Sequence, residues 1–508
     1  MPSRVFTEGI GHTNETVSAT VDSSGNLVMA KDIKLPAAGG IKTSGGAVIL
    51  NEAGGNVSLG DVRLTASGGI KDSSGNNVLS ESGGSATLGN VTITEATITG
   101  GKIDNVNLGT TFSAEANLKW NHSTDTYTEN TTLHSVTAVH RNMKRCVLNA
   151  DGTVNYYLKD TDSTKKADGT TANIDGSDGN VMVEIPKFWL RQTKVGNETT
   201  WEISDTSKTG YSVHPAFIKN GVEVSHRYIG AYSACYLDAT DSTYKSGLYL
   251  EDLSSYLDLS NDKLSSVSGV YPIVGVTRAQ CRSLAENNGS GWRVCDFYLM
   301  SAVQLLYLVE YGTFNTQSVL GNGNTSDSWD ERDASTNQAD SPTSIAGLSN
   351  SLGNGSTNVT TGASTVTDPP TAFMSYRGIE NWYGNVGQFI DGINIGVGGS
   401  YNTVYVSNTD THFADSTATN YTSLGSCASS SGYAKDILNV NGVFIPVNVV
   451  GASSSTFLCD EFRGVGNTYN AVCYFGGLPD GGNNAGGFNW NFYPNYHYNP
   501  VLGSRIAF

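Results

Sequence analysis

The sequence predicts an α+β fold in which a β-rich, repetitive fibrous stem precedes a larger head. Three observations predict this organisation. The chain of 508 residues contains 59 glycines and only 15% charged residues, a composition typical of turns and short strands rather than of helices. The first 110 residues contain an internal repeat, and only two segments of the remaining chain have the pattern of a helix.

The repeat in the stem has a period of 29 residues. The sequence GGIK at 39–42 recurs at 68–71, and other short matches follow at the same offset. Runs such as 47–50 and 56–66 alternate apolar and polar residues between Gly-Gly turns, which is typical of strand–turn–strand units. Since two such units cannot bury a core alone, the stem needs further contacts.

Residues 90–109 have a second period, of five residues. One large apolar side chain recurs in each pentad, at Ile93, Ile98, Ile103 and Leu108. This spacing is typical of β-solenoids and trimeric fibre shafts, and the alternative is a low-complexity coil with chance alternation. Because so thin a structure buries few apolar residues per coil, we expect several copies to share one axis as a homotrimer.

The composition changes at about residue 116, where tryptophan, tyrosine, phenylalanine and arginine become frequent and the repeats stop. We expect strands at 145–149, at 154–158 and within 181–192. The predicted segments are an N-terminal attachment segment (1–38), the repetitive β stem (39–115), a β-rich connector (116–180) and the head (181–508).

Two helices are predicted in the head. The first spans 277–288, with Thr277 as N-cap and Gly289 just beyond its end. The second spans 296–312, with Asp296 as N-cap, apolar residues at 299, 303, 306 and 309, and Gly312 as the stop. Two helices followed by a long turn-rich stretch of strands favour an α+β head.

The charge of the chain disfavours several partners. A net charge of -17 and a pI of about 4.8 argue against nucleic acid and anionic membranes, which need a clustered basic surface. No run approaches the roughly 18 apolar residues of a spanning helix, so no membrane insertion is expected. The N-terminus lacks the apolar stretch of a signal peptide, and we expect synthesis in the cytoplasm without Sec export.

Cysteine and histidine patterns give no metal or cofactor site. The seven cysteines are scattered, odd in number and without a C-x-x-C pair, so we expect buried free thiols rather than a zinc site or a disulfide framework. None of the eight histidines forms an H-x-x-x-H or H-E-x-x-H pair. The sequence therefore predicts no cofactor.

An ordered series of motifs in the head resembles a known family. In chain order these are RCVLNADGTVNYYL, VMVEIPKFW, VHPAF, GAYSA, LLYLVEYG, YRGIENWYGN and the terminal GSRIAF. The series is similar to phage tail-fibre and tail-tip receptor-binding proteins with a C-type-lectin-type domain, including variable proteins of diversity-generating retroelements such as the major tropism determinant. GNVGQFIDG at 384–392 resembles the GNVWEW motif of the formylglycine-generating-enzyme branch of that fold. The resemblance covers roughly residues 135–508.

The resemblance implies an adhesin of the phage virion. Its C-type-lectin-like head would bind a host cell-surface receptor, either a protein or a glycan, and residues 1–38 would dock to other virion tail proteins. Such a protein is not an enzyme. A tail-associated polysaccharide depolymerase and a purely structural tail or baseplate protein are the alternatives, and Glu310, Glu380 and Asp391 are carboxylates that a depolymerase could use.

Two other activities of this fold are not expected. Formylglycine-generating enzymes use a pair of cysteines near the C-terminus, whereas Cys459 and Cys473 lie 14 residues apart without a matching motif. Sugar-binding C-type lectins hold calcium with an E-P-N or Q-P-D tripeptide and a later W-N-D, and none of these occurs in the chain. Neither oxidase activity nor calcium-dependent sugar binding is therefore predicted.

The candidate receptor-binding residues lie near the C-terminus. Residues 488–500 are nearly all aromatic or amide, the side chains that paratopes use for large contact area and adaptable hydrogen bonds. The run lacks the aliphatic residues at period two that we expect of a core strand, and in the retroelement proteins the variable positions lie just before a terminal strand like GSRIAF. The alternative is an aromatic loop buried in a trimer interface. The candidates are Asn489, Asn491, Phe492, Tyr493, Asn495, Tyr496, His497, Tyr498 and Asn499.

Other residues are expected to support this loop rather than to bind. Trp382, Tyr383, Asn385 and Phe389 are expected to pack the core. The residues expected to set the turns and the terminal strand are Arg463, Gly464, Gly476, Gly477, Gly486, Gly487, Gly503, Ser504 and Arg505.

Overall fold

The computed structural model describes most of the head and short strands of the N-terminal part. The described ranges are 115–129, 137–246, 256–325, 343–358, 371–397, 401–464, 471–475, 485–494 and 502–508, with the backbone of strands before residue 89. The chain divides into two compact units, Met1–Val106 and Asn107–Phe508. Strands hold 38% and helices 13% of the interpretable residues, which confirms the predicted β-rich class with few helices.

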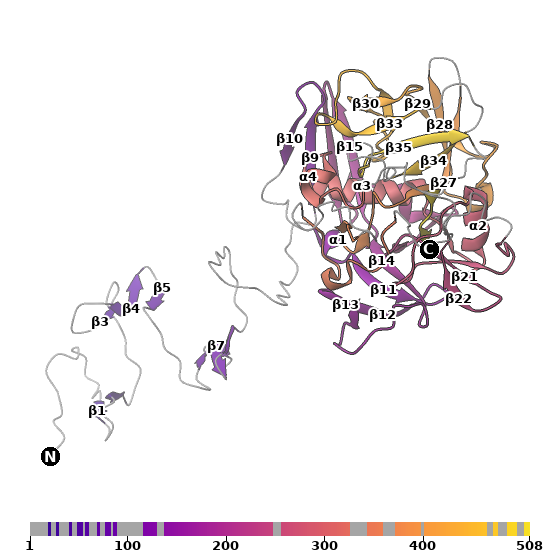
Figure 1. The fold of residues 1–508 in the computed structure, drawn as a ribbon. Helices are drawn as coiled ribbons and strands as arrows, with labels where there is room; N and C mark the ends of the chain where they lie inside the picture. The colour runs from indigo at the N-terminus through magenta and orange to yellow at the C-terminus, as the bar shows by residue number, and fades with distance from the viewer. Residues whose placement is uncertain are drawn as a thin grey trace. The chain divides into compact units, whose positions relative to one another are not determined.

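The 29-residue repeat of the N-terminal unit folds as two equivalent three-stranded sheets (Figure 1). In both, the second and third strands pair leucine with leucine, Leu50 opposite Leu59 and Leu79 opposite Leu88. The strand–turn–strand prediction is therefore confirmed for both units, while the pentads at 90–109 lie outside the described residues. The strands are β3 (Gly40–Lys42), β4 (Val48–Ala53) and β5 (Asn56–Leu59), then β6 (Gly69–Lys71), β7 (Asn77–Ser82) and β8 (Ser85–Leu88), after a hairpin of β1 (Ala19–Val21) and β2 (Leu27–Met29).

The described part of the head contains three larger sheets. The first has seven strands, and the short terminal strand lies inside it, between β20 and β24. In spatial order its strands are β13 (Asp162–Lys166), β12 (Val154–Lys159), β11 (Lys144–Leu148), β14 (Asn180–Pro186), β20 (His226–Gly230), β37 (Ile506–Ala507) and β24 (Arg293–Val294).

The second sheet has five strands and joins segments far apart in the sequence. In order these are β10 (Thr126–Glu129), β9 (Glu115–Asn121), β16 (Glu198–Ser204), β15 (Trp189–Val195) and β17 (Ser212–Val213). The predicted strand run 181–192 is divided between β14 and β15, because β14 ends at Pro186, which has no N–H for a further ladder bond.

The connector expected at 116–180 is not a separate part of the chain. Its strand β9 pairs along its whole length with β16, and β11 pairs with β14. Leu118, Trp120 and Val147 are fully buried in the same core as residues of the predicted head. The boundary expected at residue 180 therefore divides a single hydrophobic core, and the described head begins with β9.

The third sheet has eight strands and carries the C-terminal segment. In order these are β29 (Thr422–Cys427), β28 (Asn402–Val406), β27 (Gly387–Gly396), β34 (Ala471–Phe475), β35 (Trp490–Pro494), β33 (Leu458–Arg463) and β30 (Gly432–Ala434), and β36 (Leu502–Gly503) pairs in parallel with β27. Smaller pairings complete the head: β21 (Cys235–Asp238) with β22 (Thr243–Lys245) and β23 (Lys263–Ser265), β18 (Ile218–Lys219) with β19 (Val222–Glu223), β25 (Ser375–Tyr376) with β26 (Ile379–Glu380), and β31 (Asp436–Ile437) with β32 (Pro446–Asn448).

Both predicted helices are present. The second has the predicted ends, whereas the first ends at Glu286 and not at 288. Helix α2 (Arg278–Glu286) begins with a capping box of Thr277 and Gln280. Helix α3 (Phe297–Tyr311) begins at Asp296, whose carboxylate accepts from the N–H of Leu299 at 3.0 Å, and ends at Gly312 with a φ of 63°. The short elements that sequence patterns missed are α1 (Ala138–Arg141), α4 (Thr316–Leu320) and the 3-10 turns η1 (Pro215–Phe217), η4 (Asn350–Leu352) and η5 (Asp410–His412).

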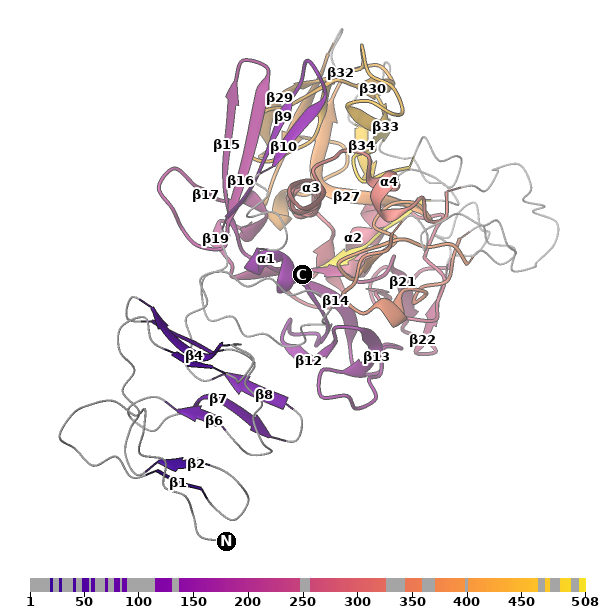
Figure 2. The same ribbon diagram turned by 90° about the vertical axis from the view of Figure 1, so that its left-hand side faces the viewer.

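Helix α3 is the centre of the head. Figures 1 and 2 show it between β9 and β27, both of which it contacts. The sequence predicts an apolar stripe, but every residue from Phe297 to Val309 is buried, including Ser301 and Gln304. A helix buried on all sides belongs to the core of a large domain, so strands of different sheets pack around it.

The terminal segment is fixed by the guanidinium group of Arg505, which is fully buried. Its nitrogens donate to Gln388 Oε1 at 2.8 Å and to the carbonyl oxygens of Gly230 at 2.7 Å, Glu380 at 2.7 Å and Asn381 at 2.8 Å. Gly503 lies so close to Ile273 that an added Cβ would be 2.2 Å from its carbonyl oxygen. The supporting roles expected of Arg505 and Gly503 thus agree with the structure.

We predict that Arg505→Met destabilises the head by about 3–5 kcal/mol, because methionine leaves several buried acceptors without a donor. Urea denaturation measures this free energy of unfolding. The matched control is Arg191→Met, since Arg191 is 41% exposed in its ion pair with Glu202, and it should cost less than about 1 kcal/mol. Equal losses for the two variants would contradict the role given to Arg505.

Candidate functional site

The C-terminal candidate residues are attached to one end of the eight-stranded sheet. Strand β34 is antiparallel to β35, with Ala471 opposite Pro494, and β33 is parallel to β35, with Arg463 opposite Asn491. The described residues Gly464, Ala471 and Pro494 therefore lie at the same end of the sheet, whereas Leu502 pairs with Gly387 at the opposite end. Sequence patterns could not predict this, because it depends on the strand order.

Two further segments reach this end of the sheet. Ile395, near the end of β27, pairs with Ala471, and Tyr401 at the start of β28 is 59% exposed. Gly464 lies against the backbone of Ser429, where an added Cβ would be 2.8 Å from the carbonyl carbon. We call this region the loop end, defined by Gly396, Tyr401, Ser429, Gly464, Ala471 and Pro494.

Three of the candidate binding residues are buried. Asn489, Asn491 and Phe492 are at most 2% exposed. Asn489 Nδ2 donates to the carbonyl oxygen of Glu461 at 2.5 Å, and Asn491 Nδ2 donates to Asn489 Oδ1. The ring of Phe492 packs against Phe462 with centroids 5.1 Å apart. These three side chains hold β35 in place, and the expectation that they face a partner is corrected.

Aromatic residues occupy the core positions of β35. Trp490 and Phe492 alternate along β35 and are both buried, and Trp490 packs against Phe297 of α3 with centroids 5.5 Å apart. The absence of aliphatic residues at period two therefore did not indicate a loop here, because aromatic side chains occupy the same core positions.

The remaining candidates are not placed by the structure. Tyr493 lies in β35, but its side chain is outside the described residues. Asn495, Tyr496, His497, Tyr498 and Asn499 also lie outside the described residues. For these six, contact with a partner stays a prediction, and the structure adds that their segment starts at the loop end.

A buried carboxyl group lies at the root of β35. Asp460 of β33 is 5% exposed, and its Oδ2 accepts from the N–H of Phe488 at 2.8 Å. At Gly486 an added Cβ would lie 1.9 Å from Asp460 Oδ1, so only glycine fits there. Burial raises the pKa of Asp460 to about 7. The charge of this group therefore changes near neutral pH.

Helices α3 and α4 hold the start of β35. The N–H of Gly487 donates to Thr316 Oγ1 at 3.0 Å, and Gln304 Nε2 donates to the carbonyl oxygen of Gly487 at 2.9 Å. An added Cβ at Gly487 would lie 2.5 Å from the ring of Trp382. The supporting roles expected of Gly486 and Gly487, and the packing role of Trp382, agree with these contacts.

The carboxylates considered for hydrolysis are bound by structural partners. Glu310 pairs with Arg377 at 2.5 Å, and Glu380 accepts from the N–H groups of Gly347 and Ser349 at 2.8 and 2.6 Å. Burial alone would raise the pKa of Glu310, but hydrogen bonds from Arg377 hold it below its usual value. Both carboxyl groups therefore serve as hydrogen-bond acceptors within the fold.

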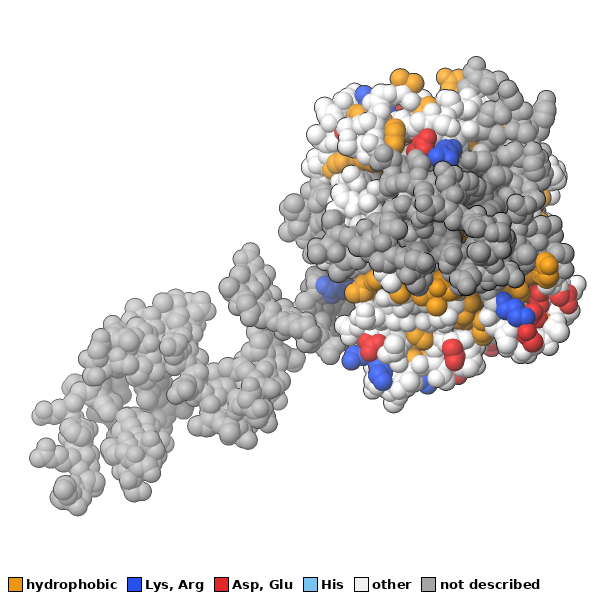
Figure 3. All heavy atoms as spheres, viewed as in Figure 1, with side chains coloured by type: hydrophobic (Ala, Val, Ile, Leu, Met, Phe, Trp, Pro, Cys, Tyr) orange, Lys and Arg blue, Asp and Glu red, His pale blue; other side chains and the backbone are white. Residues whose placement is uncertain are grey.

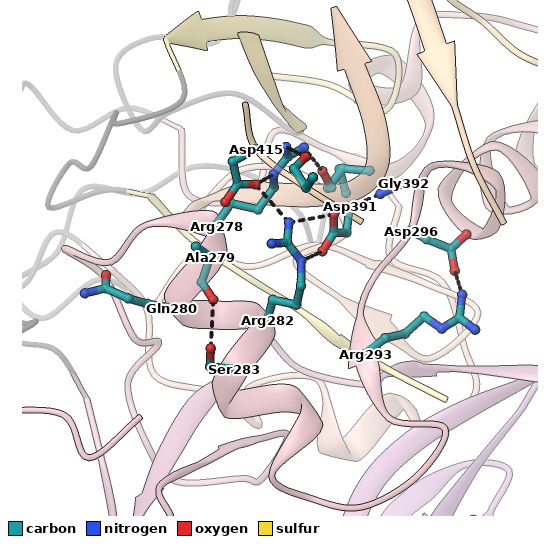
Figure 4. A network of polar contacts seen from close by, with 12 residues as sticks. Arg278, Ala279, Gln280, Arg282, Ser283, Arg293, Asp296, Asp391, Gly392 and Asp415 are labelled. Carbon is teal, nitrogen blue, oxygen red and sulfur yellow. Dashed lines mark hydrogen bonds and ion pairs between the residues drawn. The ribbon is translucent and has the colours of Figure 1, made fainter. Parts of the chain in front are cut away.

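Asp391, the third of these carboxylates, belongs to a buried network between α2 and β27 (Figure 4). Arg282 binds Asp391 at 2.6 Å and Asp415 at 2.8 Å, and Arg278 binds Asp415 at 2.7 Å. Arg278 also donates to the carbonyl oxygens of β27 residues Ile390 and Ile393. The network fastens helix to sheet, because paired charges and carbonyls satisfy one another away from water.

The described thiols are not poised for chemistry. Cys146, Cys235, Cys281, Cys295, Cys427 and Cys459 are free and buried, which confirms the expected buried thiols for these six. Burial raises the pKa of the Cys459 thiol to about 12, so it stays protonated at neutral pH. The side chain of Cys473 lies outside the described residues.

One histidine lies between a carboxylate and a hydroxyl group. His122 Nδ1 is 2.9 Å from Asp436 Oδ1, and His122 Nε2 is 2.6 Å from Thr199 Oγ1. The order of groups is that of a hydrolase triad, but Thr199 is only 1% exposed, so its hydroxyl does not meet solvent. The arrangement orients the imidazole ring, and sequence reasoning missed it because His122 and Asp436 are 314 residues apart.

We predict that Asp460 makes the stability of the head depend on pH. The folded pKa of about 7 lies above the ordinary value of 3.8, so this residue's contribution to the free energy of unfolding falls as the pH rises from about 4 to 7, by roughly 4 kcal/mol. Asp460→Asn should remove this fall, and urea denaturation between pH about 5 and 8 measures it. The control Asp168→Asn alters an exposed carboxylate; identical pH slopes for the parent and Asp460→Asn would disprove the prediction.

Comparisons with known proteins leave the family open. Neither a scan against models of protein families nor a search of curated proteins found a match. Across the described residues, no group of three or more His, Cys, Asp and Glu side chains could hold a metal ion. A search of those same residues also found no helix long and apolar enough to cross a membrane.

Proposed function

We propose that the protein is a phage tail-fibre or tail-tip adhesin that binds a host cell-surface receptor through the loop end of its head. The topology of the eight-stranded sheet carries this proposal. Gly464, Ala471 and Pro494, which adjoin the segments 465–470 and 495–501 in the sequence, lie at one end of this sheet, and Tyr401 is exposed at the same end. Loops on a rigid scaffold are where binding residues concentrate.

The proposed head is a C-type-lectin-like domain. The ordered motifs of the sequence support this assignment, since the resemblance implies a terminal strand that pairs inside a sheet. Strand β37 lies between β20 and β24, and Arg505 fixes it to β27. The GNVGQFIDG motif contributes the buried strand β27 and the fully buried residues Val386 and Phe389.

The proposed binding surface consists of residues that follow the packed part of β35. Trp490, Asn491 and Phe492 are packed into the head, while Tyr493 and the residues after it carry the tyrosines and amides suited to a partner. Tyrosine gives large contact area with little loss of rotamer entropy, and asparagine supplies hydrogen bonds in either direction. Such a surface can change its side chains without changing the strand below.

The proposed partners follow from this role. The head binds a host receptor, which is a protein or a glycan, and residues 1–38 dock to other tail proteins of the virion. A homotrimer multiplies weak single-site contacts into firm attachment, because the second and third contacts are intramolecular. A reverse transcriptase gene beside a near-copy of the 3′ end of this gene would identify the segment as diversified by a retroelement.

We predict that the triple variant Tyr493→Ala, Tyr496→Ala and Tyr498→Ala abolishes adsorption to host cells but leaves the head folded, because these side chains supply contact area rather than core packing. Adsorption of the purified protein to cells is the measurement, with circular dichroism as the folding test. The matched control is Tyr256→Ala, since Tyr256 is 64% exposed elsewhere on the head. Unchanged adsorption of a folded triple variant would contradict the assignment.

The same preparation separates the alternatives. Release of reducing ends from purified host envelope would identify a polysaccharide depolymerase. A parent protein that binds no host cell at all would identify a structural tail or baseplate protein.

We predict that the full chain is a trimer in solution. The described N-terminal strands form sheets of two or three short strands, and such sheets need further surfaces to be stable. Light scattering should give about three times the mass of 53.7 kDa. A monomeric mass at all concentrations would refute the shared-axis stem while leaving receptor binding by the head untouched.

A further inference from the structure

A polar hollow lies among hairpin ends at one end of the head. Figures 1 and 2 both place β9, β15 and β30 at this end, away from β12 and β13, and Figure 3 shows mostly uncharged side chains there. The hollow has a volume of about 500 Å³, within the range of about 300–1,000 Å³ of small-ligand sites. It is lined by His122, Ser123, Asn197, Lys435, Asp436, Asn448 and Val450.

Three distant segments build this hollow, and hydrogen bonds hold them together. The N–H of His122 after β9 donates to the carbonyl oxygen of Asn197 at 2.8 Å, in the turn between β15 and β16. The His122 ring is held by Asp436 and Thr199, and Asp436 pairs with Asn448 across β31 and β32. The walls are therefore positioned by backbone and buried side-chain contacts before any ligand arrives.

The hollow presents hydrogen-bonding groups of both kinds. The exposed side-chain amides of Asn197 and Asn448 line the hollow, and Asn448 Oδ1 accepts from the N–H of Val450 at 3.4 Å. The Oδ1 atom of Asp436 binds His122 and Lys194, at 2.9 and 3.4 Å, which leaves Oδ2 as an acceptor. The ammonium group of Lys435 lies 4.9 Å from the ring centre of Phe457 and is a donor. Val450, 75% exposed, adds an apolar surface.

We propose that this hollow binds a carbohydrate of one or two sugar units. Amides and a carboxylate facing one space match the hydroxyl groups of a sugar, each of which both donates and accepts. Val450 offers a surface for the C–H face of the ring. The site goes beyond the proposed function, because it is built from residues of β9, β15–β16 and β31–β32 and not from the loop end.

The charges in the hollow argue against other small ligands. Burial alone would raise the pKa of Asp436, but the hydrogen bond from His122 and the charge of Lys194 hold it below its usual value. The lining itself carries one carboxylate, Asp436, and one ammonium group, Lys435, so these two charges cancel, and an uncharged ligand is favoured over phosphate or carboxylate. A peptide would need an aromatic or aliphatic pocket as anchor, whereas Val450 is the apolar residue of the lining.

The test uses the purified full chain and soluble probes. Methyl glycosides of glucose, galactose, mannose and N-acetylglucosamine are titrated in saturation-transfer NMR, beside inorganic phosphate and acetate. We expect at least one glycoside to bind in the millimolar range, and Asn197→Ala and Asn448→Ala each to weaken it by up to about tenfold, through the loss of hydrogen bonds to the sugar. Asn173→Ala, an exposed amide near β12, is the matched control and should bind as the parent does.

Three results would overturn the proposal. These are binding of no glycoside by the parent, binding of phosphate or acetate instead, and equal affinity of the Asn197→Ala, Asn448→Ala and Asn173→Ala variants. The tyrosine variant of the loop end should keep its affinity for the glycoside. Failure of host adsorption and failure of sugar binding are therefore separate outcomes.

Discussion

The head depends on arginine side chains that lie wholly inside it. Arg145, Arg227, Arg278 and Arg505 are each at most 1% exposed. A chain rich in irregular segments buries many backbone carbonyl groups outside regular ladders, and each of these needs a donor. A guanidinium group carries five N–H donors, and these four residues donate to carbonyl oxygens of Gly378, Ala216, Ile390, Ile393, Gly230, Glu380 and Asn381. The chain therefore has few charged residues, 15% of the total, and yet buries several of them inside the head.

The buried arginines and their carbonyl partners stabilise the core of the head, whereas the two proposed binding surfaces lie outside this network. The loop end rests on β33, β34 and β35. Just before β35, the backbone of Gly487 is hydrogen-bonded to Gln304 of α3 and Thr316 of α4, and Trp490 of β35 packs against Phe297 of α3. The polar hollow rests on hairpins fixed by His122. The hollow residues Asn197, Asn448 and Val450 are exposed, so substitutions there are expected to leave the fold intact. Asp460 differs from these residues, since its proton equilibrium acts on the root of β35.

Local signals in the sequence predicted the features that depend on neighbouring residues. Thr277, Asp296 and Gly312 fix helix ends through bonds within a turn, and the 29-residue repeat needs only alternation and glycine. Other features depend on contacts between distant residues. The pairing of β9 with β16 joins the expected connector to the head. Trp490 and Phe492, whose aromatic side chains suggest a binding loop in the sequence, are instead buried in a core strand. The carboxylate partner of His122 is 314 residues away, so no spacing could indicate that site.

The six buried thiols can report where the head opens locally. Each is shielded from solvent and kept protonated by burial, so a thiol reagent can react only when the surrounding structure separates. Cys146 lies in the seven-stranded sheet, Cys295 just before α3, and Cys459 in β33 below the C-terminal segment. The order in which these sulfur atoms become labelled would therefore report which layer of the head loosens first, without any substitution in the chain.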